Sequence, residues 1–162
     1  MRTTSICAGL GLEFAIATSA SARPMLQYGA LLDGLQQVPP NATPATGFGT
    51  MDIDTDANTM TIHVEYSGLV GTQTDQHIHG FAPAGVNASV IFPLPAGGSP
   101  INAVWNFTEA QQANILAGLT YVNIHTTVFP GGEIRGQIVP VPEPTGLALI
   151  ALGAIPMLRR RR

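Results

Sequence analysis

The chain has 162 residues, of which 45% are hydrophobic and only 10% are charged, and its formal net charge is −3 at pH 7. All seven basic residues are arginines, and five of them lie near the termini. Residues 23–140 therefore carry eight acidic residues against Arg23 and Arg135, a net charge of −6. A surface of this sign repels phosphate backbones and anionic lipid headgroups, which excludes a nucleic-acid-binding function.

The first 22 residues have the parts of a secretory signal peptide. Arg2 gives a basic start, Ile6–Ala17 is mostly apolar, and Ala20-Ser21-Ala22 has the small-residue pattern of a cleavage site. The alternative is an amphipathic first helix of the fold. The only cysteine, Cys7, lies in this segment, so the cleaved protein has no thiol and no disulfide. We predict export and one domain over residues 23–140.

This domain contains short segments with a hydrophobic period of two. Within Met60–Tyr66, apolar side chains alternate with polar ones, as in a half-buried strand. Clusters rich in Gly, Pro and Asn separate such segments. The predicted strands are Leu26–Leu32, Phe48–Ile53, Met60–Tyr66, Gln76–Gly80, Ser89–Leu94, Ala103–Phe107, Tyr121–Val128 and Glu133–Val139. The pattern predicts an all-β fold, a Greek-key β-sandwich of seven or eight strands.

One segment, Thr108–Gly118, has helical features instead. Thr108 can cap the first turn, Gln111 occupies the reciprocal position of a capping box, and Gly118 ends the helix. We predict one short helix inserted between strands.

Three of the four histidines lie in two strand patterns. In His77-Ile78-His79, the two imidazoles share one face of the strand about 6.6 Å apart, and Ile78 faces the core. In Tyr121–Thr126, His125 lies opposite the apolar face. If the two strands are neighbours, His77, His79 and His125 form a three-histidine set, which suits copper or zinc. His63 is a weaker fourth candidate. The alternative is that these histidines only occupy polar positions of amphipathic strands.

A second cation pattern runs from Asp54 to Glu65. Asp54, Asp56 and Asn58 occupy ligand positions of a calcium loop, and Glu65 lies eleven residues after Asp54. Thr59 stands where such a loop requires glycine, and a strand follows instead of a helix, so we expect a solvated hairpin turn.

The segment Phe129–Ile138 is expected to be structural. Its glycines permit a tight turn, and Glu133 and Arg135 share the outer face of a strand, where Arg135 holds a carboxylate or a backbone carbonyl. The chain has no nucleophile motif and no phosphate-binding glycine loop, so we expect no enzymatic activity.

The C-terminal residues 141–162 have three parts: Pro142-Glu143-Pro144, an apolar run from Thr145 to Leu158, and four arginines, Arg159–Arg162. As a helix, the run of about 14 residues spans about 21 Å, less than a bilayer core of ~30 Å, but it can insert because arginines snorkel. This segment resembles the PEP-CTERM sorting signal. The resemblance implies transient membrane anchoring and cleavage by an exosortase-type protease; a permanent tail anchor is the alternative.

The motifs between the two terminal signals resemble those of the CHRD domain, and they occur in the same order. They are Ala30–Gly34, Gln37-Val38-Pro39-Pro40, Gly68-Leu69, His77–Gly80, Ala117-Gly118, Tyr121–Thr126 and Gly131–Gln137. Usual members have Glu where Gln37 stands. The resemblance implies a secreted domain of this fold and leaves its role open.

The Gly68-Leu69 pair, the histidine strand after it and the later His125 also resemble copper/zinc superoxide dismutase. This likeness implies a superoxide-dismutase-like sandwich with His77, His79 and His125 as copper ligands. The chain lacks the long zinc loop and the disulfide of that enzyme, shows no clear bridging histidine, and has few cations to attract superoxide. We therefore do not expect dismutase activity.

These features indicate an exported, non-enzymatic protein of the cell envelope, cell surface or extracellular matrix that binds copper, or zinc, through His77, His79 and His125. A purely structural or adhesive module without metal is one alternative, and a superoxide-dismutase-like oxidoreductase is another. The expected partners are an exosortase-type protease and extracellular polymer or surface proteins.

Overall fold

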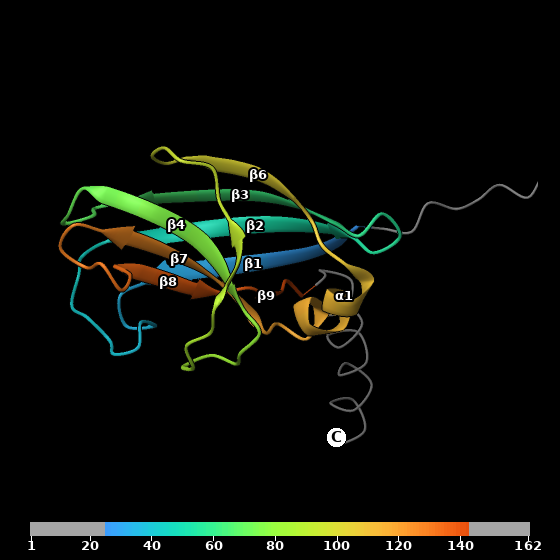
Figure 1. Ribbon diagram of the computed structural model, residues 1–162. Coiled ribbons are helices and arrows are strands. Elements are labelled where there is room, and N and C mark those ends of the chain that lie inside the picture. The colour runs from blue at the N-terminus through green and yellow to red at the C-terminus, as the bar shows by residue number, and fades with distance from the viewer. Residues whose placement is uncertain (1–24, 143–162) are drawn as a thin grey trace, which may run out of the picture.

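A computed structural model describes residues 25–142 (Figure 1). Its elements, in chain order, are β1 (Leu26–Asp33), β2 (Thr46–Asp54), β3 (Thr59–Ser67), β4 (Gln73–Gly80), β5 (Val90–Pro93), β6 (Ile101–Asn106), α1 (Glu109–Leu116), β7 (Thr120–Thr126), β8 (Ile134–Gln137) and β9 (Val139–Pro140). The prediction of an all-β fold with one short helix is confirmed for these residues.

The nine strands form one antiparallel sheet in the order β5-β4-β7-β8-β1-β2-β3-β6, with β9 paired to β1. Strands β8 and β1 are paired at a single position, Asp33 with Arg135, whereas their other neighbours pair over longer stretches. The sheet divides there into two halves. The chain crosses to the half that contains β4 and β5 after β3, and it returns to the first half at β6, which pairs with β3. It then crosses a second time through α1, so β4 and β7 lie side by side (Figure 1).

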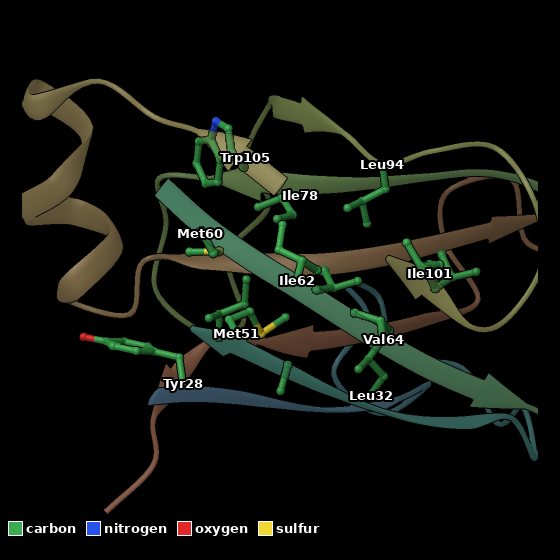
Figure 2. Close-up of a cluster of buried hydrophobic side chains, with 14 of the residues drawn as sticks. Tyr28, Leu32, Met51, Met60, Ile62, Val64, Ile78, Leu94, Ile101 and Trp105 are labelled. Atoms are coloured by element: carbon green, nitrogen blue, oxygen red, sulfur yellow. The ribbon is translucent and has the colours of Figure 1, made fainter. Parts of the chain in front are cut away.

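The hydrophobic core fills the space between the inner faces of the two halves (Figure 2). Ile62 and Met51 come from one half and Ile78 from the other, and all three are almost fully buried. Trp105 stacks on Phe92 with ring centroids 5.5 Å apart. Each buried side chain of this size contributes roughly 1.5–3 kcal/mol. Because residues 25–142 contain no cysteine, this burial takes the place of disulfides.

Helix α1 begins with the predicted capping interaction. The side-chain oxygen of Gln111 accepts a hydrogen bond of 2.8 Å from the backbone N–H of Thr108. The chain leaves the helix through Gly118, whose φ of +71° suits glycine. Ile115 is the buried residue of the helix and Leu116 packs partly against the core, so α1 covers one end of the core.

The last predicted strand, Glu133–Val139, is divided in two. Strand β8 pairs with β7, whereas β9 pairs with β1 through Tyr28 and Gly29. Between them, Ile138 turns its side chain into the core and donates its N–H to the carbonyl of Thr120 at 2.9 Å. The count of nine strands, against the seven or eight expected, results from this division.

Both predicted export signals lie largely outside the described residues. The signal peptide of residues 1–22 and the apolar segment Thr145–Leu158 are not part of residues 25–142. Within residues 25–142, no helix has the length and apolar character needed to cross a membrane.

Candidate metal centre

The three predicted histidines lie on the outer face of two paired strands. On β4, Ile78 points into the core, so His77 and His79 point to the opposite side. Strand β7 alternates in the same way, with His125 on the outer side. The register of the two strands pairs His77 with Asn123, His79 with Tyr121 and Asp75 with His125. The hypothesis that the strands are neighbours is therefore confirmed.

The imidazole rings converge on one point. Ring centroids are 5.7 Å apart for His77 and His79, 5.3 Å for His77 and His125, and 5.9 Å for His79 and His125. One nitrogen from each ring lies within 4.8 Å of the other two. Nitrogens bound to one tetrahedral or trigonal zinc at 2.0–2.1 Å are roughly 3.5 Å apart. A bound ion thus requires the ring nitrogens to approach each other by up to about 1.3 Å.

Each ring is oriented by a hydrogen bond from its other nitrogen. His79 Nδ1 lies 2.9 Å from the carbonyl oxygen of Ala88, and His125 Nδ1 lies 2.9 Å from that of Pro130. His77 Nε2 lies 3.0 Å from a carboxylate oxygen of Asp75. These oxygens only accept, so each contacting nitrogen carries the proton. The opposite nitrogen of each neutral ring then holds a lone pair.

The opposite nitrogens of the three rings have no hydrogen-bond partner in the described residues. His77 Nδ1, His79 Nε2 and His125 Nε2 are buried and have no hydrogen-bond partner among residues 25–142. Buried polar atoms without a partner are uncommon in folded proteins and indicate a ligand or ion. Outer hydrogen bonds that fix the tautomer of each histidine are typical of metal sites. The donor set therefore fits a metal ion bound by three neutral imidazoles.

The electrostatics of His79 favour the neutral form. Burial lowers its pKa below the ordinary value of 6.5; the hydrogen bond to Ala88 acts in the opposite direction, and the nearby His125, His77 and Arg135 lower the pKa further. His79 is only 9% exposed because the loop of residues 81–89 covers it. The interpretation that both rings of the pair face outward is correct for the sheet, but His79 is not open to solvent.

Tyr121 contacts both His79 and the loop that covers it. Its ring is stacked on His79, with centroids 5.0 Å apart and an angle of 8° between the planes. The guanidinium of Arg135 lies 3.4 Å from the centroid of the same ring. The Tyr121 hydroxyl accepts from the N–H of Ala88 at 3.0 Å and so ties the 81–89 loop to β7.

Glu133 and Arg135 are buried, which corrects the expectation of an open outer face. Arg135 is 1% exposed and donates to the carbonyl of Val86 at 2.9 Å and to the side chain of Asn87 at 3.2 Å. It thus holds a backbone carbonyl, one of the two roles predicted for it. Strand periodicity assigned Arg135 to the correct side of the sheet but does not reveal that a loop covers it.

The two weaker cation candidates lie elsewhere. His63 is on β3, in the other half of the sheet, where it contacts Asn102 and Glu65. One carboxylate oxygen of Asp54 accepts from two backbone N–H groups of the turn between β2 and β3. Glu65 pairs with Phe48 along β3, well away from this turn. The hairpin interpretation is therefore confirmed. The calcium-loop pattern exists in the sequence spacing alone, because the fold does not bring Glu65 to the turn.

Sequence reasoning missed the partners that orient the histidines. Asp75 could have been found, because it lies two residues before His77 and so shares its face. The carbonyls of Ala88 and Pro130 could not, because every residue has one and only the folded loops bring these two to the rings.

A family model for the CHRD domain matches residues 28–138. The chain belongs to the CHRD domain family. The match covers all the strands from β1 to β8 except the first two residues of β1, and it includes all three histidines of the candidate metal centre. No curated protein and no solved structure matches the chain. The likeness to superoxide dismutase therefore stays a prediction.

Proposed function

We propose that this CHRD protein binds one copper ion, or zinc, through His77 Nδ1, His79 Nε2 and His125 Nε2. The observation that carries the proposal is the set of three buried nitrogens with no partner in the described residues, each opposite a nitrogen whose proton is held by an oxygen. In their neutral form, the three imidazoles of such a set offer three lone pairs to one ion.

The ligand chemistry favours copper over other divalent ions. Imidazole suits zinc, copper, iron and nickel, and at a given nitrogen site copper(II) has the highest affinity among the first-row divalent ions. Calcium and magnesium prefer oxygen ligands. Three imidazoles leave a coordination position for water or another group, so zinc can complete a tetrahedral site in the same place.

The protein is proposed to act outside the cytoplasm. Residues 1–22 support export, and residues 141–162 support transient membrane anchoring and cleavage by an exosortase-type protease. Delivery to the cell surface or extracellular matrix follows, where polymer or surface proteins are the expected partners. A domain without cysteine keeps its core and its histidines in an oxidising compartment.

A non-enzymatic role fits the surroundings of the histidines better than dismutase activity. Arg135 is the only basic residue other than histidine in residues 25–142, and it is buried, so the described surface offers no exposed arginine or lysine to attract superoxide. A structural or adhesive module that binds no metal is the second candidate, because α1 and the core do not depend on the histidines.

Metal content decides between these candidates. We would express the protein from its full sequence, purify it without a histidine tag, expose it to copper and zinc, and measure bound metal by mass spectrometry. The comparison uses a His77→Ala, His79→Ala double variant, with His63→Ala as the matched control. About one ion per chain, lost only in the double variant, supports the proposal. Wild-type protein without stoichiometric metal would leave the structural module, and turnover of superoxide by the copper-loaded protein would contradict the non-enzymatic role.

A further inference from the structure

Four exposed apolar side chains lie together on the outer face of β1, β2 and β9. Leu31 is 69% exposed, Phe48 50%, Val139 46% and Val141 45%. Leu31 is paired with Phe48, and Val139 is paired with Gly29, so the members of each pair share one face of the sheet. We call the four side chains the β9 patch. Apolar side chains that gather on one exposed face are typical of sites that contact another molecule or a membrane.

Gly29 allows the side chains of β9 and β2 to approach each other. A Cβ at this position would lie 3.2 Å from Cγ2 of Val141 and 3.9 Å from Cε2 of Phe48. The two side chains therefore meet above the backbone of β1. Thr50, which is paired with Gly29, continues the same surface without a charge. The β9 patch is thus one continuous surface across three strands.

The chain is held to the sheet as far as the last residue of this patch. Strand β9 is paired with β1, and the backbone N–H of Val141 donates to the carbonyl of Gln27 at 2.9 Å. Only residues 142–144 separate Val141 from the apolar run Thr145–Leu158. The four Cα–Cα steps from Val141 to the start of that run span at most about 14 Å. The patch is therefore joined to the apolar run by a very short tether.

This tether keeps the patch close to a bilayer into which the apolar run is inserted. The headgroup region is roughly 5–8 Å thick on each side of the hydrocarbon core. Val141 then lies no more than about 9 Å above the headgroups, so the domain cannot move away from the lipid surface. A surface held this close has an effective concentration in about the millimolar range, so a weak contact is sufficient.

We propose that the β9 patch rests on the lipid surface while the tail anchors the protein. This inference rests on the membrane anchoring that is part of the proposed function. A second copy of the chain fits the patch less well, because a stable interface buries roughly 800 Å² on each partner and four half-exposed side chains supply much less. Contact with lipid requires no minimum area, since its strength grows with the apolar area that is buried.

Acidic residues at the rim of the patch make this contact reversible. Asp52 is paired with Gln27 and Glu65 with Phe48, so two carboxylates lie beside the patch and oppose anionic headgroups. The patch then holds the domain on the membrane only as long as the tether does, and cleavage of the tail releases the protein. The candidate metal centre lies on the outer face of the other half of the sheet, so it faces away from the membrane during anchoring.

The contact is tested with the full chain in phosphatidylcholine vesicles, by spin labels on single introduced cysteines. Cys7→Ser removes the natural thiol. Thr50→Cys places a label beside the patch and keeps all four of its side chains, and Val128→Cys, at a position that is 52% exposed after β7, is the control. The label at position 50 should be about threefold or more less accessible to an aqueous nickel chelate than the label at position 128.

Flotation of the vesicles distinguishes the two ways in which this test can fail. A chain that does not float with the vesicles overturns the anchoring, and the lipid contact with it. A chain that floats but has two equally accessible labels overturns the lipid contact alone. Magnetic coupling between labels at position 50 that disappears on dilution with unlabelled chains indicates that a second copy covers the patch, which also overturns the proposal.

A charge placed in the patch tests which residues make the contact. In the chain labelled at position 50, Phe48→Glu should raise the accessibility to the nickel chelate about twofold or more, because a carboxylate resists transfer out of water. Val104→Glu is the matched control, since Val104 is 56% exposed on β6, outside the patch. Equal accessibility in the two variants contradicts a lipid contact through Phe48.

A longer tether tests the geometric argument. About 20 Gly and Ser residues inserted after Val141 have an end-to-end distance of roughly 25 Å, which lets the domain leave the surface. The label at position 50 should then become nearly as accessible to the nickel chelate as the label at position 128. Protection that the insertion does not change would contradict the role of the short tether.

Discussion

His77 and His79 lie two residues apart on one face of β4, and they use opposite ring nitrogens for their hydrogen bonds. His77 bonds through Nε2 to Asp75 on its own strand, whereas His79 bonds through Nδ1 to the carbonyl of Ala88 in the covering loop. The remaining nitrogens, Nδ1 of His77 and Nε2 of His79, are the buried atoms that join His125 Nε2 in the candidate metal centre. Each histidine thus depends on a different outer partner.

Asp75→Ala should weaken metal binding without unfolding the protein. The Asp75 carboxylate fixes the tautomer of His77, and loss of such an outer partner typically lowers metal affinity about tenfold or more. The Asp75 side chain is 62% exposed, so the free energy of unfolding should change by less than about 1 kcal/mol. Competition with a chelator measures the affinity. Glu109→Ala removes an exposed carboxylate on α1 and serves as the control; equal affinities in the two variants would show that Asp75 has no orienting role.

The metal-free protein should lose stability as the pH falls below about 6.5, through His79. Its pKa is lowered in the folded state, chiefly by burial, so the unfolded chain binds a proton first. The free energy of unfolding therefore decreases as the pH falls from the unfolded pKa of about 6.5 to the lower folded pKa. Below the folded pKa, His79 causes no further decrease. Urea unfolding at pH 7.5 and pH 5.5 measures the difference, and His79→Gln should reduce it.

His63 provides a control of opposite sign. Its hydrogen bond to Asn102, and then that to Glu65, raise its pKa in the folded state. The stability it contributes is present below about pH 6.5 and is lost as the pH rises through the folded pKa. His63→Gln should therefore make the fall in stability toward pH 5.5 larger. A smaller fall in this variant would refute the assigned direction.

The local features of the fold were predictable from the sequence because they depend on neighbouring residues. The period of two in Met60–Tyr66 is a consequence of alternate burial on β3, and the capping pair of Thr108 and Gln111 is formed as predicted. The division of β8 from β9 was missed. It arises from the pairing of Val139 with Gly29, more than a hundred residues away, which no local pattern encodes.

The candidate metal centre was predictable only in part for the same reason. The spacing of His77 and His79 places both on one face, but the approach of His125 depends on the pairing of β4 with β7. Arg135 illustrates the other limit. Alternation assigns it to the outer face, yet the loops after β1 and β4 cover that face and convert an expected surface cation into a buried one.

Glu133→Gln should destabilise the protein by about 3 kcal/mol. The carboxylate is fully buried and accepts hydrogen bonds from the hydroxyls of Thr43 and Thr126 and from the backbone N–H groups of Val70 and Gly71. An amide in its place would turn an N–H₂ group toward donors. Chemical denaturation at pH 7 measures the loss, and Glu109→Gln, on the exposed face of α1, is the control that should change little.

The same carboxylate makes a stabilising contribution that depends on pH. Burial alone would raise the pKa of Glu133, but the hydrogen bonds from Thr43, Val70, Thr126 and Gly71 outweigh it and lower the pKa below 4.5. The contribution is present above about pH 4.5 and is lost as the pH falls through the folded pKa. In Glu133→Gln, unfolding in acid should depend less on pH than in the wild type; an unchanged acid transition would place the responsible carboxyl elsewhere.

Gly132→Ala should lower both the free energy of unfolding and the metal affinity. The turn at Gly132 lies against a buried hydrogen bond between Gln37 and Asn123, and it also contains the carbonyl that orients His125. Gly132 has a φ of +124°, and a Cβ there would lie 2.6 Å from Gln37 Nε2 and closer still to Asn123 Oδ1. These two atoms form a buried hydrogen bond of 2.7 Å. The side chains or the turn must move, and the turn carries the Pro130 carbonyl that orients His125.

The expected cost of Gly132→Ala is about 2 kcal/mol in the free energy of unfolding, from backbone strain and the broken hydrogen bond. Gly131→Ala is the matched control, since a Cβ at Gly131 meets no atom within 4 Å. Denaturation and chelator competition on both variants separate the two effects. If Gly132→Ala is destabilised but binds copper as tightly as Gly131→Ala, then the Pro130 carbonyl does not set the orientation of His125, and its ring is held by the neighbouring strands alone.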